Sequence, residues 1–190
     1  MFKLKYQINK NDIVFTQYPF KCSYASKKKI IPAYNIQEMV ETFGMPSIRV
    51  NENELVFISA VDRKLLTNFC TENAIPINKR VDVWGIILDV FLDTMHSEEW
   101  IQKSLAQLYN CGISEVECIN LRQEVAGRMV AYNFTSGFWE WVHLGLCDLL
   151  YASMGFLSGE RYRLSDDEFE KFYFKAMEIA LKGIVLETIR

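Results

Sequence analysis

The 190-residue chain has few of the residues and motifs that identify a chemistry. It contains two histidines, four prolines and nine glycines, and it has no glycine-rich phosphate loop, no G-x-S-x-G elbow and no C-x-x-C pair. These absences exclude the common phosphate-binding, serine-hydrolase and dithiol motifs. Its 50% hydrophobic and 24% charged residues are instead typical of a globular chain with a sizeable core.

The five cysteines predict a reducing compartment. Their number is odd, and most of them stand among apolar residues, as buried free thiols do. The N-terminus has no apolar run typical of a signal peptide, so we expect a cytoplasmic protein. The most hydrophobic window, 138–157, contains Glu140, His143 and Asp148. Because such groups are costly inside a bilayer, this window predicts a buried core helix and no transmembrane segment.

Charge is divided unequally along the chain. Residues 1–80 carry 12 Lys and Arg against 7 Asp and Glu, whereas residues 81–190 carry 9 against 17. A nucleic-acid partner needs a basic face, so the acidic larger part argues against one. Two interpretations stay open: the two parts attract each other, or an acidic helical surface binds another, basic protein.

Hydrophobic spacing predicts an α+β protein in which a small strand-rich region, 1–78, packs against a five-helix bundle, 79–190. Apolar and polar residues alternate in KLKYQI and DIVFTQY, and SIRV-NENE-LVFIS predicts a hairpin with Asn51 and Asn53 in its turn. A helical stripe over 61–73 closes this region. The bundle helices are expected near 81–93, 98–110, 115–132, 138–154 and 166–187.

Three of these helix ends have specific signals. Ser114 with Glu117 and Ser165 with Glu168 have the spacing of capping boxes, in which each side chain bonds the other residue's backbone amide. Gly112 follows an expected helix and suits the left-handed position at its end.

Two segments resemble known proteins. The hairpin SIRVNENELVFIS and the helix at 61–73 resemble small bacterial domains related to pleckstrin-homology folds, over residues 1–75. The segment from Lys79-Arg80-Val81-Asp82-Val83-Trp84 to Leu92-Asp93-Thr94 is similar to uncharacterised bacterial proteins of unassigned activity. The resemblance implies a pleckstrin-homology-like N-terminal region and assigns no functional residue.

Each histidine follows a carboxylate by three residues, as Asp93 precedes His96 and Glu140 precedes His143. On a helix this spacing places both groups on one face, as in di-iron bundles. His96 stands just before the expected Ser97 cap, so the first copy spans a loop, and two more ligands would be needed. A helical metalloenzyme centred on Glu140 and His143 is therefore the alternative. The leading interpretation is a hydrogen-bonded His143 and a surface His96, with no metal or cofactor.

His143 and Cys147 are four residues apart and would share a helix face, where a base can activate a thiol. Catalytic cysteines usually lie at a helix N-terminus, and Cys147 is expected in mid-helix. We therefore assign no catalytic residue.

The run Lys27-Lys28-Lys29 precedes the apolar pair Ile30-Ile31. It predicts a solvated turn, and in a pleckstrin-homology-like fold such a loop can also bind an anionic membrane surface.

Aromatic residues crowd the expected helix at 138–154, where Trp139 and Trp141 either pack centrally or form an exposed binding anchor. Ion pairs are expected between Arg80 and Asp82, and between Arg122 or Arg128 and the nearby Glu115, Glu117 and Glu124. The leading interpretation places these pairs at the surface, and the alternative is buried pairs that tie the two parts together. The acidic helical part, the aromatic surplus and the lack of a complete catalytic set favour a non-enzymatic protein that binds another protein. We expect an adaptor or an acidic inhibitor that neutralises a toxin.

Overall fold

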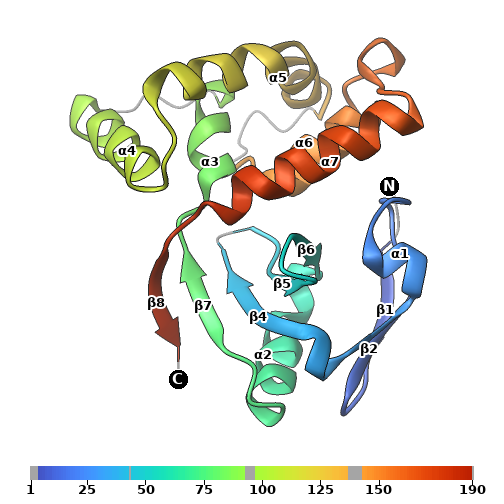
Figure 1. Ribbon diagram of the computed structural model, residues 1–190. Coiled ribbons are helices and arrows are strands. Elements are labelled where there is room, and N and C mark those ends of the chain that lie inside the picture. The colour runs from blue at the N-terminus through green and yellow to red at the C-terminus, as the bar shows by residue number, and fades with distance from the viewer. Residues whose placement is uncertain (1–3, 43, 93–96, 137–142, 190) are drawn as a thin grey trace. The chain divides into compact units, whose positions relative to one another are not determined.

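The computed structural model is an α+β structure, as the sequence predicts (Figure 1). It describes residues 4–42, 44–92, 97–136 and 143–189. Two compact units divide the chain: unit 1 comprises Met1–Arg80 with Val185–Arg190, and unit 2 comprises Val81–Ile184. The last strand therefore belongs to unit 1, within a stretch that the sequence assigns to the helical region.

Unit 1 begins with a three-stranded antiparallel sheet in the order β1-β2-β3. Its elements are β1 (Lys5–Ile8), β2 (Asp12–Gln17), α1 (Tyr24–Lys28) and β3 (Ile30–Pro32). The buried residues of β2 alternate with less buried ones, so the predicted period of two is confirmed.

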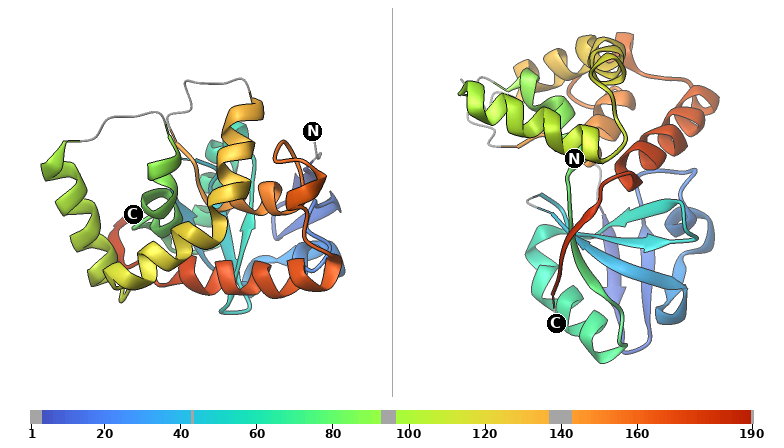
Figure 2. Two further views of the ribbon diagram at one scale, coloured as in Figure 1. Left: turned by 90° about the horizontal axis from the view of Figure 1, so that it is seen from above. Right: turned by 60° about the vertical axis from the view of Figure 1, so that its left-hand side comes forward.

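A second, five-stranded sheet has the order β6-β5-β4-β7-β8. Its strands are β4 (Ile36–Glu41), β5 (Ser47–Val50), β6 (Glu54–Phe57), β7 (Ile77–Arg80) and β8 (Val185–Ile189). The helix α2 (Arg63–Glu72) precedes β7, which pairs in parallel with β4, while all other pairs are antiparallel. Figure 2 shows β8 beside β7 at one edge of this sheet.

The predicted hairpin between β5 and β6 is confirmed. Asn51 and Glu52 both have positive φ angles, 51° and 64°, within a three-residue connection between the paired residues Val50 and Glu54. Asn tolerates this left-handed conformation better than most residues do.

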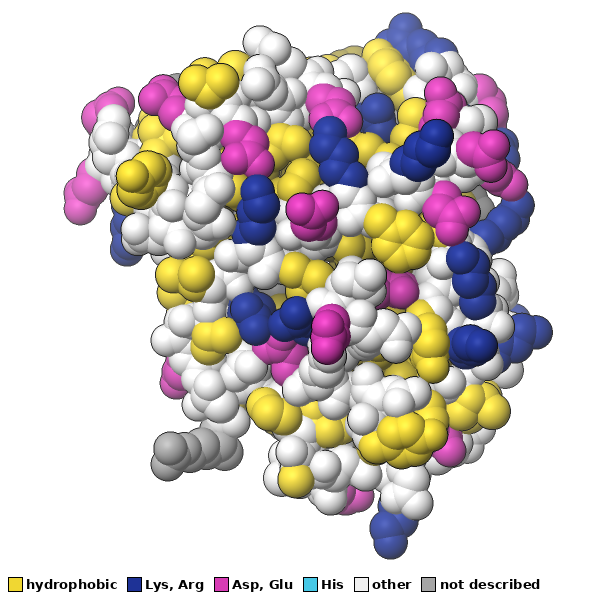
Figure 3. Space-filling model, viewed as in Figure 1, with side chains coloured by type: hydrophobic (Ala, Val, Ile, Leu, Met, Phe, Trp, Pro, Cys, Tyr) yellow, Lys and Arg dark blue, Asp and Glu magenta, His cyan; other side chains and the backbone are white. Residues whose placement is uncertain are grey.

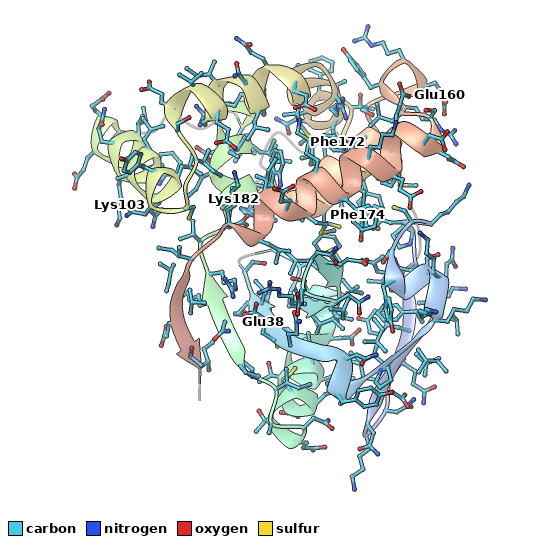
Figure 4. The ribbon with its side chains drawn as sticks, viewed as in Figure 1. Glu38, Lys103, Glu160, Phe172, Phe174 and Lys182 are labelled. Atoms are coloured by element: carbon cyan, nitrogen blue, oxygen red, sulfur yellow. The ribbon has the colours of Figure 1, made fainter. Side chains whose placement is uncertain are left out.

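A buried carboxylate organises the middle of this sheet. Glu38 on β4 is 3% exposed, and its oxygens accept bonds from Arg80 at 2.8 and 3.0 Å, from Asn78 at 2.6 Å and from Arg49 at 3.3 Å. Figure 4 labels Glu38 in this position. The expected pairing of Arg80 with Asp82 is wrong, because the strand register brings Arg80 to Glu38 instead.

Unit 2 contains five α-helices in its described residues. They are α3 (Val83–Leu88), α4 (Glu98–Asn110), α5 (Glu115–Ser136), α6 (Leu146–Ser153) and α7 (Asp166–Leu181). Short 3-10 helices in the chain are η1 (Ala33–Asn35), η2 (Ala60–Asp62), η3 (Asp89–Phe91) and η4 (Glu160–Tyr162). No helix in the described part of the chain has the length and apolar character needed to span a bilayer.

Three of the expected bundle helices are shorter than the sequence predicts. The helix expected near 81–93 is α-helical at Val83–Leu88, and the 3-10 helix η3 follows it. Residues 143–145 are not helical, so α6 begins only at Leu146. The helix expected over 166–187 ends at Leu181, and β8 follows from Val185. Gly183 lies against the carbonyl of Val81, where a side chain would collide, and the chain then leaves the helical path.

The helix-end signals are largely confirmed. Ser165 and Glu168 form the full capping box of α7, and Gly112 has a φ of 74°. Ser114 accepts the Glu117 amide at 3.2 Å, and the Glu117 carboxylate bonds Lys182 at 2.9 Å. The first and last helices of unit 2 are also joined, because buried Trp84 donates its indole N–H to the Ala176 carbonyl at 2.8 Å.

Candidate functional site

The side chains of His143 and Asp82 are paired inside unit 2. The His143 Nε2 atom lies 3.1 Å from Asp82 Oδ2, and the two side chains are 22% and 29% exposed. Asp82 is the N-cap of α3, where its Oδ1 accepts the Gly85 amide at 2.8 Å. A single carboxylate therefore both begins a helix and binds an imidazole.

Two glycines make room for the imidazole ring. A Cβ atom on Gly85 would stand 2.8 Å from His143 Cε1 and 2.8 Å from Asp82 Cγ. A Cβ atom on Gly145 would stand 3.1 Å from His143 Nε2. The ring thus packs against bare backbone on the first turn of α3 and just before α6.

A second carboxylate lies at the start of α6. Asp148 accepts the Gly145 amide at 2.9 Å and the Tyr132 hydroxyl of α5 at 3.0 Å. These bonds connect α5 and α6 to the short segment that carries His143. Burial raises the pKa of Asp148 despite both bonds, because desolvation disfavours the charged carboxylate.

The pKa of His143 is raised above its ordinary value of 6.5. The hydrogen bond to Asp82 is the main cause, burial acts against it, and the charges of Asp82, Asp148 and Asp89 add to the rise. The imidazolium form is therefore favoured, because a nearby negative charge stabilises a cation.

Cys147 lies in the first turn of α6, contrary to the mid-helix position expected from the sequence. Burial and the neighbouring Asp148 nevertheless hold the pKa of its thiol well above 9.0. His143 precedes the helix, so the expected His143–Cys147 helix face does not form. A thiol kept protonated in this way is a poor nucleophile.

The metal hypothesis requires Glu140 and His143 to lie on one face of a helix, and the structure does not place His143 in a helix. The Nε2 atom of His143 is bonded to Asp82. Among the described residues, no group of three or more His, Cys, Asp and Glu side chains could hold a metal ion. The expected co-ligand Glu140 lies outside the described residues, so a metal site at Glu140 and His143 stays a hypothesis.

Of the other predicted site residues, the structure describes only the three lysines, which belong to unit 1. Trp139, Glu140 and Trp141 lie outside the described residues, as does His96 with Asp93. Lys27 and Lys28 end α1 in unit 1, and Lys29 caps that helix with a φ of 63°. All three lysines are exposed.

A different feature of unit 2 was not predicted from the sequence. The helix α5 is apolar on two opposite faces. One face is buried and includes Leu121, Val125 and Met129. The other, which we name the outer face of α5, consists of Val116, Ile119, Val130 and Phe134, exposed by 68%, 44%, 56% and 69%.

Acidic and basic side chains are mixed on one face of unit 2. On the face in Figure 3, acidic and basic side chains lie next to one another rather than in separate blocks. Lys175 bonds Glu124 at 2.7 Å, and Arg128 lies 4.8 Å from the ring centre of Phe172, which Figure 4 labels. Arg122 donates to the Ile87 carbonyl and not to a neighbouring glutamate.

Comparison with known proteins finds no family model, no curated protein and no solved structure that matches this chain. The resemblance of residues 1–75 to pleckstrin-homology-like domains thus stays a prediction. Sequence reasoning missed the roles of Asp82, Gly85 and Gly145. One local signal was present, because Asp is a common N-cap residue and Asp82 stands directly before the apolar run from Val83.

Proposed function

We propose that this protein is a non-enzymatic protein that binds another protein through unit 2. The observation that supports this function best is the outer face of α5. A helix that is exposed on one side normally carries polar residues there. Here Val116, Val130 and Phe134 are each more than half exposed, and large apolar side chains at the surface are typical of protein-binding sites.

The charge of unit 2 suggests the kind of partner. Residues 81–184 carry 16 Asp and Glu against 8 Lys and Arg. Because a net negative unit attracts cationic proteins over a distance, we propose a basic partner. An acidic inhibitor that neutralises a basic toxin fits this description, and so does an adaptor.

The test compares two lysine substitutions at exposed valines. Val130→Lys places a charge on the outer face of α5, whereas Val61→Lys makes the same change in unit 1 at a valine that is 89% exposed. Tagged wild-type protein and both variants capture proteins from a lysate of the native host, and the retained protein is purified for binding measurements. We expect Val130→Lys to lower its affinity by about tenfold or more, as loss of an apolar anchor does.

Val61→Lys should bind like the wild type. Equal affinity of both variants for the retained protein would contradict a binding role for α5. The affinity of the wild type should also fall as salt is raised, since screening weakens attraction between oppositely charged proteins.

A second candidate function rests on the basic residues of unit 1. Lys27, Lys28 and Lys29 are all exposed beside Ile30, which is 50% exposed. Basic residues next to an apolar one suit an anionic membrane surface, where each lysine contributes about 1 kcal/mol. Co-sedimentation with anionic vesicles tests this function. Binding that persists when all three lysines are changed to glutamate would contradict it.

A further inference from the structure

We propose that His143 is a pH-sensitive latch within unit 2, which fastens the segment before α6 to the start of α3 when its imidazole is protonated. The latch consists of His143, its partner Asp82, and the two glycines, Gly85 and Gly145, between which the ring packs. This inference is independent of the proposed binding partner.

The geometry gives the imidazole one well-defined position. Its Nε2 atom bonds the Asp82 carboxylate at 3.1 Å, and the same carboxylate is fixed by the Gly85 amide at 2.8 Å. A methyl group on Gly85 would stand 2.8 Å from the ring, and one on Gly145 would stand 3.1 Å from it, so the ring lies close to the backbone of both residues. Small displacements of His143 would therefore break the contact rather than stretch it.

The segment that His143 holds has further bonds of its own. Gly145 donates to Asp148, and Asp148 accepts the Tyr132 hydroxyl. These two bonds do not depend on the proton of His143. Opening of the latch is thus expected to loosen residues 143–145 and the start of α6 without unfolding the whole unit.

The charges around the ring favour its protonated form. On the side of α3 and η3 these are Asp82 and Asp89, and on α6 it is Asp148. Titratable groups near this cluster also include Cys147 and Tyr151 on α6 and Tyr132 on α5, whose pKa values are raised by burial and which stay neutral near neutral pH. Protonated His143 places a positive charge beside these carboxylates.

The direction of the pH effect follows from linkage. The folded-state pKa of His143 lies above its unfolded value of 6.5, so its stabilising effect is complete below that pH and is lost as the pH rises through the folded pKa. Asp148 also has a raised pKa, from a starting value of 3.8, and its effect has the same sign. Variants at His143 and Asp82 separate the two contributions.

Proton NMR titration tests the latch directly. The chain has two histidines, and a His96→Gln variant assigns the remaining signal to His143. We expect its pKa to lie above 6.5, and to fall in Asp82→Asn, which keeps an N-cap residue for α3 but removes the charge. A His143 pKa at or below 6.5 in the wild type, or an unchanged pKa in Asp82→Asn, would overturn the proposal.

Hydrogen exchange provides the conformational readout. As the pH rises from about 6 to about 9, amides at the start of α6 should open more often in the wild type. The exchange rates are first corrected for the pH dependence of intrinsic exchange. The opening constant should rise by about tenfold for each unit by which the pKa of His143 differs between closed and open states. His96→Gln should behave like the wild type, and His143→Gln should lose this pH dependence.

If His143→Gln shows the same pH dependence of opening as the wild type, the latch is contradicted, because the effect then belongs to another group. Should His143→Gln fail to fold, the comparison of wild type with Asp82→Asn decides alone. Equal opening of these two proteins at about pH 6 would then overturn the proposal, and greater opening of Asp82→Asn would support it.

Discussion

At the scale of single residues, two glycines inside helices are expected to respond oppositely to the same substitution. An alanine normally stabilises a helix interior by about 1 kcal/mol relative to glycine. At Gly85 the new methyl group would stand 2.8 Å from both members of a bonded pair, His143 and Asp82. We expect Gly85→Ala to lower the free energy of unfolding by about 1–3 kcal/mol, as overpacking does.

The matched control is Gly127 on α5. An alanine there would meet the outer end of the Tyr162 ring at 2.7 Å, and this side chain is only partly buried and can turn away. Gly127→Ala should therefore be neutral or stabilising. Urea unfolding followed by circular dichroism measures both variants. If Gly85→Ala raises the free energy of unfolding, the His143 side chain can move away from the new methyl group at little cost.

Pairings between residues distant in sequence are the part of the site that the sequence could not predict. Arg80 and Asp82 are neighbours of opposite charge, which suggested a local pair. In the structure, Arg80 is carried by β7 to Glu38, which lies 42 positions earlier on β4, and Asp82 meets His143. Strand register and helix packing decide such pairs, and neither can be deduced from charge spacing alone.

At the scale of elements, the sequence predicted those features that depend on interactions between neighbouring residues. The hairpin between β5 and β6 and the capping box of α7 each depend on a few adjacent residues. The helix predicted over 182–187 is wrong, because pairing with β7 competes with the helical spacing of this stretch. Val185, Thr188 and Ile189 are β-branched and suit a strand once a neighbouring edge is available.

The strand β8 leads to a prediction about solubility. It lies at the end of the sheet order, and all five of its residues are exposed, including Leu186 at 54%. An apolar edge strand invites pairing with other chains, and natural proteins often protect such edges with lysine. We expect Leu186→Lys to raise the temperature at which the protein begins to aggregate.

Light scattering during heating measures this onset. Val61→Lys adds the same charge at an exposed site outside any strand, so it controls for net charge alone. If the two variants aggregate at the same temperature, the edge of β8 does not govern self-association. An unchanged circular dichroism spectrum would verify that Leu186→Lys keeps the β7–β8 pair.

At the scale of the whole molecule, unit 2 is an insertion within unit 1. The chain leaves the sheet after Arg80 and returns at Val185, and these two residues are paired in the β7–β8 register. The two connecting segments also touch, because the Val81 amide donates to the Ile184 carbonyl at 3.0 Å. Insertions whose ends lie this close together are tolerated well and often fold alone.

This arrangement predicts that each unit survives the removal of the other. Residues 81–184 alone should be helical and unfold cooperatively in urea, since α3 and α7 are already joined by the bond from Trp84 to Ala176. The test of unit 1 is a protein in which the dipeptide Asn-Gly replaces residues 81–184, so that these two residues join Arg80 to Val185. A type I′ turn fits two residues between antiparallel strands, so β7 and β8 should stay paired. A gradual, non-cooperative loss of helix in the 81–184 fragment would show instead that unit 2 depends on unit 1 for its fold.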